Sequence, residues 1–343
     1  MIARSQTRPV ISNMAVYEKQ DDADQVFAIE TWRYLRVSMI VFVVGIFAAV
    51  GFEMSKTHPH CFATSISAYY YTPVHGFFIG ALIAVGTCLI CLKGNTPGED
   101  ILLNLAGMFA PVVALVPTPN PGSCGSVLTT TENRDTNISN NMFVLLFLGA
   151  IALIFLAAFI LVLRRRSGGP LSRGAVIGYG VTVVVWGYAF VTFGWWRSFF
   201  THTAHYTAAI LMFFCFLLVV IADAISFRKH TEHGSPPKTP ARQRVESAVA
   251  RTKLPPNRYG YIAALMIIDI IVFVILWIAS WKYWVIGIEA SLITLFAVFW
   301  GLQTAELWGK GLRGAGESNR GMPPGANMVE PAGVGTDSDA DAA

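Results

Sequence analysis

The sequence predicts an all-α fold: a polytopic transmembrane bundle of about eight membrane-spanning helices. Of the 343 residues, 54% are hydrophobic and only 13% are charged, whereas an average soluble domain has about 25% charged residues. The apolar residues also come in runs of about 20, long enough to cross a hydrocarbon core of roughly 30 Å as a helix. These runs do not alternate, so they exclude a transmembrane β-barrel.

The flanking segments are polar. Residues 1–31 have mixed charges and no cleavable signal peptide, and we expect a cytoplasmic N-terminal segment there. Residues 32–308 form the predicted transmembrane bundle, with a basic cytoplasmic linker at 228–258. Residues 309–343 are rich in glycine and proline and are predicted to be a disordered cytoplasmic tail.

The ends of the apolar runs define the predicted helices. Glu99 and Asp100 favour a helix start because acids are stabilised at the positive end of the helix dipole, and Pro111 predicts a kink. Three arginines, 164–166, end the fourth run. The predicted helices cover about residues 32–54, 74–92, 100–116, 142–163, 174–194, 204–227, 259–281 and 284–307.

Lysine and arginine are unequally divided between the two sides that eight alternating helices create. On one side lie 21 of the 25 basic residues; the other side has only Lys56, Arg134, Arg197 and Lys282. Basic residues near membrane helices favour the cytoplasm. The distribution therefore predicts that both termini are cytoplasmic.

The stretch SISAYYYTPVHGFFIGALIA, residues 65–84, joins polar residues to an apolar helix. Gly76 and Gly80 predict close packing against a neighbouring helix. Three consecutive tyrosines cannot all face one environment, so we expect some of them to point into an outward-facing pocket that binds a lipid or small ligand. The alternative is an ordinary interfacial role for these rings. The predicted lining residues are Tyr69, Tyr70, Tyr71, His75, His205 and Glu289.

A membrane-embedded, metal-dependent hydrolase is a second hypothesis. His202 and His205 are three residues apart and can share a helix face, which makes them weak metal candidates, although histidines that hydrogen-bond loops explain the pattern as well. The sequence has no HExxH, Walker or GxSxG motif and no dinucleotide fingerprint. It therefore favours a protein without metal, cofactor or enzymatic activity, and leaves the question of catalysis open.

A proton-coupled transporter is the third hypothesis, based on Asp269 in the middle of an apolar run. An acid at that depth costs roughly 2.5–3.5 kcal/mol and normally faces the bundle interior or a cavity. Proton transfer and structural hydrogen bonding are equally good explanations. Asp100, Asp223 and Glu306 lie near the cytoplasmic helix ends, where we expect them to be solvated, and Asn104 and Gln303 are candidates to bridge helices.

Two cysteines, Cys61 and Cys124, fall in separate outward loops, and the other three lie within apolar helices. An oxidising exterior favours a disulfide between Cys61 and Cys124; two free thiols are the alternative. The basic linker 228–258 is expected to contact anionic membrane lipids. It lacks the aromatic residues of a nucleic-acid site, so membrane lipids, and no nucleic acid, are the predicted partners.

Four segments resemble an uncharacterised family of bacterial, largely actinobacterial, multi-pass membrane proteins. The tyrosine-rich segment 65–93 carries most of the resemblance, and the other three segments are 104–117, 205–214 and 289–300. Together they extend over most of residues 32–308. The resemblance implies a helical bundle in the bacterial inner membrane. It implies no activity or catalytic residue.

Overall fold

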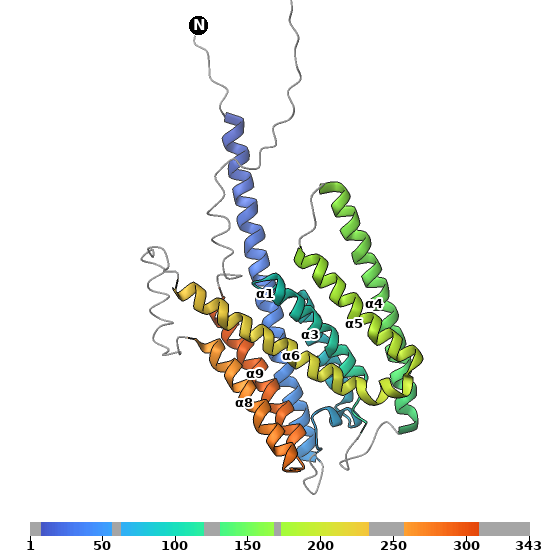
Figure 1. The fold of residues 1–343 in the computed structure, drawn as a ribbon. Helices are drawn as coiled ribbons and strands as arrows, with labels where there is room; N and C mark the ends of the chain where they lie inside the picture. Colours follow the sequence, from blue (N-terminus) through green and yellow to red (C-terminus); the bar gives the residue numbers. More distant parts are fainter. Residues whose placement is uncertain (1–7, 57–62, 120–130, 168–172, 233–256, 309–343) are drawn as a thin grey trace, which may run out of the picture.

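The structure is a computed structural model that describes residues 8–56, 63–119, 131–167, 173–232 and 257–308. All regular secondary structure in these ranges is helical (Figure 1), so the all-α prediction is confirmed for them. The elements are α1 (Arg8–Lys56), the 3₁₀ helix η1 (Ser67–Tyr71), α2 (His75–Cys91), α3 (Pro97–Leu115), α4 (Thr131–Ser167), α5 (Arg173–Trp195), α6 (Arg197–Glu232), α8 (Arg258–Ile278) and α9 (Trp284–Glu306).

Within the described ranges, seven helices have the length and composition to cross a membrane, which supports the prediction of a membrane protein. They are α3, α5, α8, α9 and the segments Phe27–Lys56 of α1, Asn133–Arg166 of α4 and Arg197–Phe227 of α6. Helix α2 is apolar but has only 17 residues. At 1.5 Å per residue it is about 26 Å long, slightly less than a typical hydrocarbon core.

Three helices begin earlier than the apolar runs predict. Polar residues before the runs continue the helices at 8–31 in α1, 131–141 in α4 and 197–203 in α6. Apart from Pro9 in the first turn of α1, these stretches contain no proline and no glycine, the residues that most disfavour a helix interior. Apolar patterning therefore predicted the apolar part of each of these helices, but not where the helices start.

The helix bundle has an upper and a lower end in the view of Figure 1. The upper end contains Pro97 and Arg258, and the lower end contains Lys56, Leu115 and Trp284 (Figure 1). Helix α3 begins at the upper end with a capping interaction, because the backbone N–H of Glu99 donates to Thr96 Oγ1 at 3.2 Å. Its other end is held by side chains of the lower end.

Helices α2 and α3 make the closest helix contact through Gly86 and Gly107. A Cβ atom built on Gly86 would lie 2.7 Å from the Gly107 carbonyl oxygen, and one on Gly107 would lie 2.5 Å from the Gly86 oxygen. Only glycine fits both positions. The expectation that Gly76 and Gly80 form such a contact was wrong, because a Cβ on either meets nothing within 4 Å.

Helices α4 and α5 form a hairpin at one side of the bundle (Figure 1). In the apolar part of each, 6% of the residues are buried, against 44% in α3. The hairpin is anchored at the lower end, where Ile138 and Met142 of α4 pack with Val116, Phe193 and Phe200. The other long helices share the larger apolar core, so the hairpin is a peripheral unit.

Candidate functional site

All three tyrosines of η1 are buried. Tyr69, Tyr70 and Tyr71 belong to an apolar cluster that also includes Ile46 of α1 and Phe78 of α2. Burial raises the pKa of each phenol above its ordinary value, so all three are neutral at physiological pH. The rings thus fill the space between helices instead of dividing between two environments.

Glu289 of α9 holds the beginning of η1. Its Oε2 accepts the backbone N–H of Ile66 at 2.5 Å and that of Ser67 at 3.4 Å, and its Oε1 accepts the Ser67 hydroxyl at 3.1 Å. The first N–H groups of a helix lack partners within it, and a carboxylate there is favourable. Glu289 therefore acts as a cap that ties α9 to the tyrosine segment.

His75 completes this group at the start of α2. Its Nδ1–H donates to the Tyr70 carbonyl at 2.8 Å, and its ring packs edge-on against the Tyr70 ring at 4.2 Å. Five of the six predicted pocket residues are thus brought together. Glu289 binds the start of η1, His75 binds the Tyr70 carbonyl and Tyr71 binds the Thr118 carbonyl. The buried Tyr69 hydroxyl has no hydrogen-bond partner among the described residues.

The sixth residue, His205 of α6, binds the segment that follows α3, two residues before the Thr118 carbonyl that Tyr71 binds. It is buried, and its Nδ1–H donates to the Val116 carbonyl at 2.6 Å. His202 is exposed and uses its Nδ1 toward the Ser198 carbonyl at 2.7 Å. The two histidines do not converge, and the described residues contain no group of three His, Cys, Asp or Glu side chains arranged for a metal ion.

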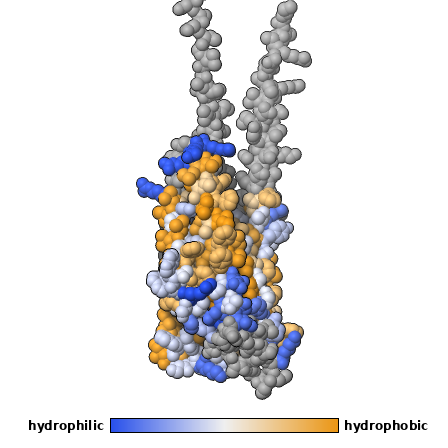
Figure 2. Space-filling view, turned by 90° about the vertical axis from the view of Figure 1, so that its right-hand side faces the viewer, coloured by the Kyte–Doolittle hydropathy of each residue, from blue (hydrophilic) through white to orange (hydrophobic). Residues whose placement is uncertain are grey.

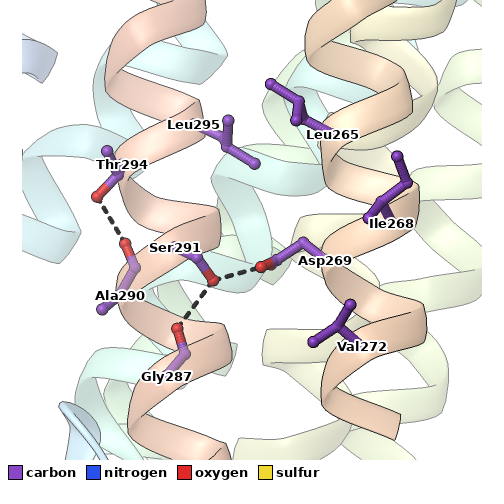
Figure 3. A pocket seen from close by; sticks show the side chains of 9 residues that line it. All are labelled: Leu265, Ile268, Asp269, Val272, Gly287, Ala290, Ser291, Thr294 and Leu295. Carbon is purple, nitrogen blue, oxygen red and sulfur yellow. Dashed lines mark hydrogen bonds between the residues drawn. The ribbon is translucent and has the colours of Figure 1, made fainter. Parts of the chain in front are cut away.

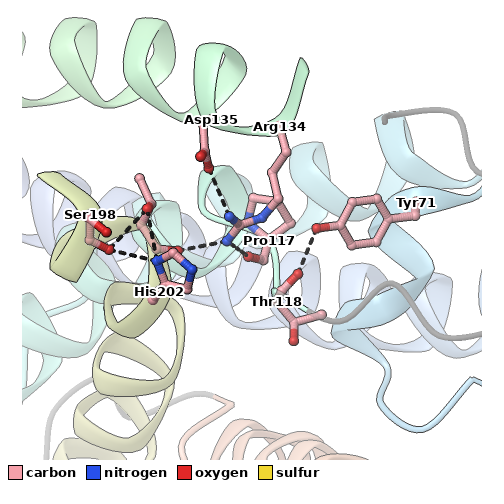
Figure 4. Close-up of polar contacts among 8 residues, drawn as sticks. Tyr71, Pro117, Thr118, Arg134, Asp135, Ser198 and His202 are labelled. Atoms are coloured by element: carbon pink, nitrogen blue, oxygen red, sulfur yellow. Dashed lines mark hydrogen bonds and ion pairs between the residues drawn. The ribbon is translucent and has the colours of Figure 1, made fainter. Parts of the chain in front are cut away.

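Arg134, which the sequence analysis treated only as a charge that marks one side, is buried among polar partners at the lower end (Figure 4). Its Nη2 donates to the carbonyls of Pro117 at 3.0 Å and Thr201 at 2.7 Å, and Nη1 pairs with Asp135 at 3.0 Å. It therefore links α4 to the end of α3 and the start of α6.

Three side chains converge on the carbonyls that follow α3. The Tyr71 hydroxyl donates to the Thr118 carbonyl at 2.7 Å (Figure 4). His205 donates to the Val116 carbonyl and Arg134 to the Pro117 carbonyl. Carbonyls at a helix C-terminus lack intrahelical donors, and cationic side chains are favourable there. This lower-end cluster is a cap for the end of α3, assembled from three other elements, η1, α4 and α6.

A second polar network lies at the upper end around Asp223. Its carboxylate accepts Asn95 Nδ2 at 3.0 Å and Gln303 Nε2 at 2.5 Å, and Glu99 accepts the Asn95 backbone N–H at 2.8 Å. Asp223 is fully buried, so the expectation of a solvated acid was wrong. Gln303 does bridge helices, as predicted.

A third polar site lies between α8 and α9, in a groove of about 570 Å³ (Figure 3). Asp269 points from α8 toward α9, where the Ser291 hydroxyl donates to its Oδ2 at 2.8 Å. The lining is otherwise apolar or weakly polar, consisting of Leu265, Ile268, Val272, Gly287, Ala290, Thr294 and Leu295. Sequence reasoning identified Asp269 but missed the small residues of α9 that open the groove.

The groove exists because the facing residues of α9 are small. Gly287, Ala290 and Ser291 leave space opposite Asp269 (Figure 3). Gly287 itself is covered by Phe273, whose ring would lie 2.3 Å from an added Cβ. A run of small residues spaced three and four apart on α9 is the signal that could have identified this face.

Cys61 and Cys124 lie outside the described residues, and their disulfide stays a prediction. Within the described ranges Cys88, Cys91 and Cys215 are free thiols.

Comparisons of the chain with protein-family models, with curated proteins and with solved structures found no match. The resemblance to the bacterial membrane-protein family therefore also stays a prediction.

Proposed function

We propose that this chain is a bacterial inner-membrane protein that crosses the membrane eight times, with both termini in the cytoplasm. The seven membrane-length helices and the apolar α2 support the count, and the 21 basic residues on one side support the orientation. Reporter fusions after Arg166 and after Arg244 are expected to read cytoplasmic, and one at Arg134 external. An external signal at either of the first two sites contradicts this topology.

We further propose that the protein binds a lipid or small amphiphilic ligand in the groove between α8 and α9. The observation that carries the proposal is the carboxylate of Asp269 inside an otherwise apolar groove. The Ser291 hydroxyl donates a hydrogen bond to Oδ2 of Asp269, whereas Oδ1 of Asp269 accepts no hydrogen bond within the described residues. That oxygen is an acceptor for a ligand, and the volume lies within the range of small-molecule sites.

The depth of Asp269 restricts the chemistry of the ligand. It lies 11 residues after Arg258, the first residue of α8, or about 16 Å along the helix axis. This is near the middle of a hydrocarbon core of roughly 30 Å. A phosphate group would be repelled by the carboxylate and poorly solvated at this depth. The site therefore suits an amphiphile whose small polar group is a hydroxyl or an amine.

The test uses the purified full chain in detergent with two photoactivatable probes, a long-chain amine and the fatty acid of the same length. We expect the amine to label peptides of α8 and α9, and the fatty acid to label them weakly. Asp269→Asn should lower amine labelling about tenfold, because a hydrogen bond to a charged group contributes about 1.5–3 kcal/mol. Ile271→Leu, on the exposed face of α8, is the control and should label normally.

If the wild-type and Asp269→Asn chains label equally, the groove is not the binding site for the amine.

Proton-coupled transport is the second candidate function, because Asp269 is an acid at bilayer depth whose carboxylate is open to the groove. The same variant tests it. A proton-driven flux in proteoliposomes that Asp269→Asn abolishes, with amine labelling unchanged, would favour transport over ligand binding.

A further inference from the structure

One face of α5 combines an arginine with three bare glycines. Arg173, Gly180, Gly187 and Gly194 are spaced seven residues apart, nearly two helical turns, so they follow one face with a small drift. All four are exposed. A Cβ atom built on any of the three glycines meets nothing within 4 Å, so the space above this strip is open in the described part of the chain.

The upper end of the hairpin concentrates positive charge. Arg164, Arg165 and Arg166 form the last turn of α4 and are exposed. Two hydrogen bonds hold α4 and α5 together: the Tyr179 hydroxyl donates to the Leu153 carbonyl at 3.2 Å, and Trp186 Nε1 donates to the Leu146 carbonyl at 3.2 Å. Arg173 lies about 9 Å above Tyr179 along the axis of α5, and Arg164 about 17 Å above Leu153 along α4. The four arginines therefore lie at the same end of the hairpin, with the α4 arginines extending further along the axis.

The hairpin supplies no acidic side chain near its four arginines. The sequence contains no aspartate or glutamate from residue 136 through 222. None of the four arginines has a hydrogen bond or ion pair with the described residues. On α3, whose Pro97 lies against Gly174 of α5, Asp100 pairs with Lys93 and Glu99 is buried.

The arginines border a broad apolar surface. Large side chains beside the glycine strip are strongly exposed, including Ile177 and Val184 of α5, and Phe155 of α4 is exposed as well. Figure 2 shows the side of the molecule where the hairpin lies: an apolar region extends below a hydrophilic upper edge. A ligand that matches both parts has an anionic head and a hydrocarbon tail.

We propose that this face of the hairpin binds an anionic phospholipid, with its phosphate on Arg173 and the α4 arginines and one acyl chain along the glycine strip. Guanidinium groups bind phosphate oxygens through paired hydrogen bonds. From Arg173 to Gly187 the strip is about 21 Å long, enough for the roughly 15 Å acyl region of one leaflet and the phosphate above it. The bare glycines let the chain lie directly against the α5 backbone. This site is separate from the Asp269 groove.

The experiment measures the lipid retained by the full chain after extraction from vesicles that contain equal amounts of phosphatidylglycerol and phosphatidylcholine. The wild-type chain is expected to retain phosphatidylglycerol preferentially. Arg173→Gln should lower that preference about fivefold, the effect of one basic residue near a membrane surface. Gly187→Leu should lower total retained lipid, because its side chain occupies the acyl position. Excess inorganic phosphate should displace little lipid, since it cannot replace the acyl contacts.

Two matched variants control for charge and for size. Arg197→Gln removes an exposed arginine at the lower end, and Gly51→Leu enlarges an open glycine on α1; both should retain lipid as the wild type does. The proposal is overturned if Arg173→Gln and Arg197→Gln have equal effects, or if phosphate displaces the lipid completely. It is also overturned if Gly187→Leu splits an oligomer without changing lipid retention, because the strip would then contact a second copy of the chain.

Discussion

Replacing Arg134 by methionine is expected to destabilise the folded protein by roughly 3–5 kcal/mol. The variant keeps much of the apolar volume but removes the donors that serve the carbonyls of Pro117 and Thr201. Both acceptors would stay at the lower end without their buried donor, and an unpaired buried polar group is more costly than the hydrogen bond itself is favourable. Thermal unfolding of the purified protein in detergent, followed by circular dichroism, measures the change.

Arg197→Met is the matched control for Arg134→Met. Arg197 is also at the lower end, but it is exposed and stacks on Phe193, so its replacement should change stability little. Arg134→Lys should give an intermediate loss, because an ammonium group cannot reproduce the fork of a guanidinium. If Arg134→Met and Arg197→Met unfold at the same temperature, Arg134 does not join α3, α4 and α6 in the way described.

Replacing Glu289 by alanine is the second change with a large expected effect, on the order of 3 kcal/mol. The variant removes the acceptor of two backbone N–H groups and of the Ser67 hydroxyl. The tyrosine segment would then lose its link to α9. We expect a lower unfolding temperature and a weaker near-ultraviolet circular dichroism signal, since Tyr69, Tyr70 and Tyr71 owe their fixed environment to this packing.

Two variants of α9 separate the cap from general effects on the helix. Glu289→Gln keeps one acceptor oxygen and should lose less stability than Glu289→Ala. Thr294→Val removes a hydroxyl that bonds only to its own helix, at the Ala290 carbonyl, and should be close to neutral. An unchanged tyrosine signal in Glu289→Ala would show that η1 is held without its carboxylate cap.

The sequence predicted the apolar helices well because the length and composition of an apolar run are local properties. It also placed Asp269 within an apolar helix and Gln303 between helices. The hydrogen-bond partners of Arg134, His205 and Tyr71 could not be predicted from the sequence, because all three side chains bind backbone carbonyls. Every residue has such a carbonyl, so residue types alone do not reveal which ones a fold leaves without a helical donor.

Asp223 shows the same limitation for burial. Its position near a helix end suggested contact with solvent, yet Asn95 and Gln303 from other elements cover its carboxylate. The close contact of Gly86 with Gly107 likewise depends on which faces of α2 and α3 meet. Gly76 and Gly80 have the same four-residue spacing as many packing motifs, but on α2 they face open space.

The lower-end cluster also bears on how such a chain can change its number of helices. His205 binds the Val116 carbonyl, and Arg134 joins Pro117 to Thr201, so α3 ends beside the point where α6 begins. The α4–α5 hairpin therefore leaves the bundle and returns to it at the same end. Gaining or losing such a hairpin changes the number of crossings by an even number. The helices after it keep their direction, which makes this junction a place where evolution can add or delete a module without inverting the protein.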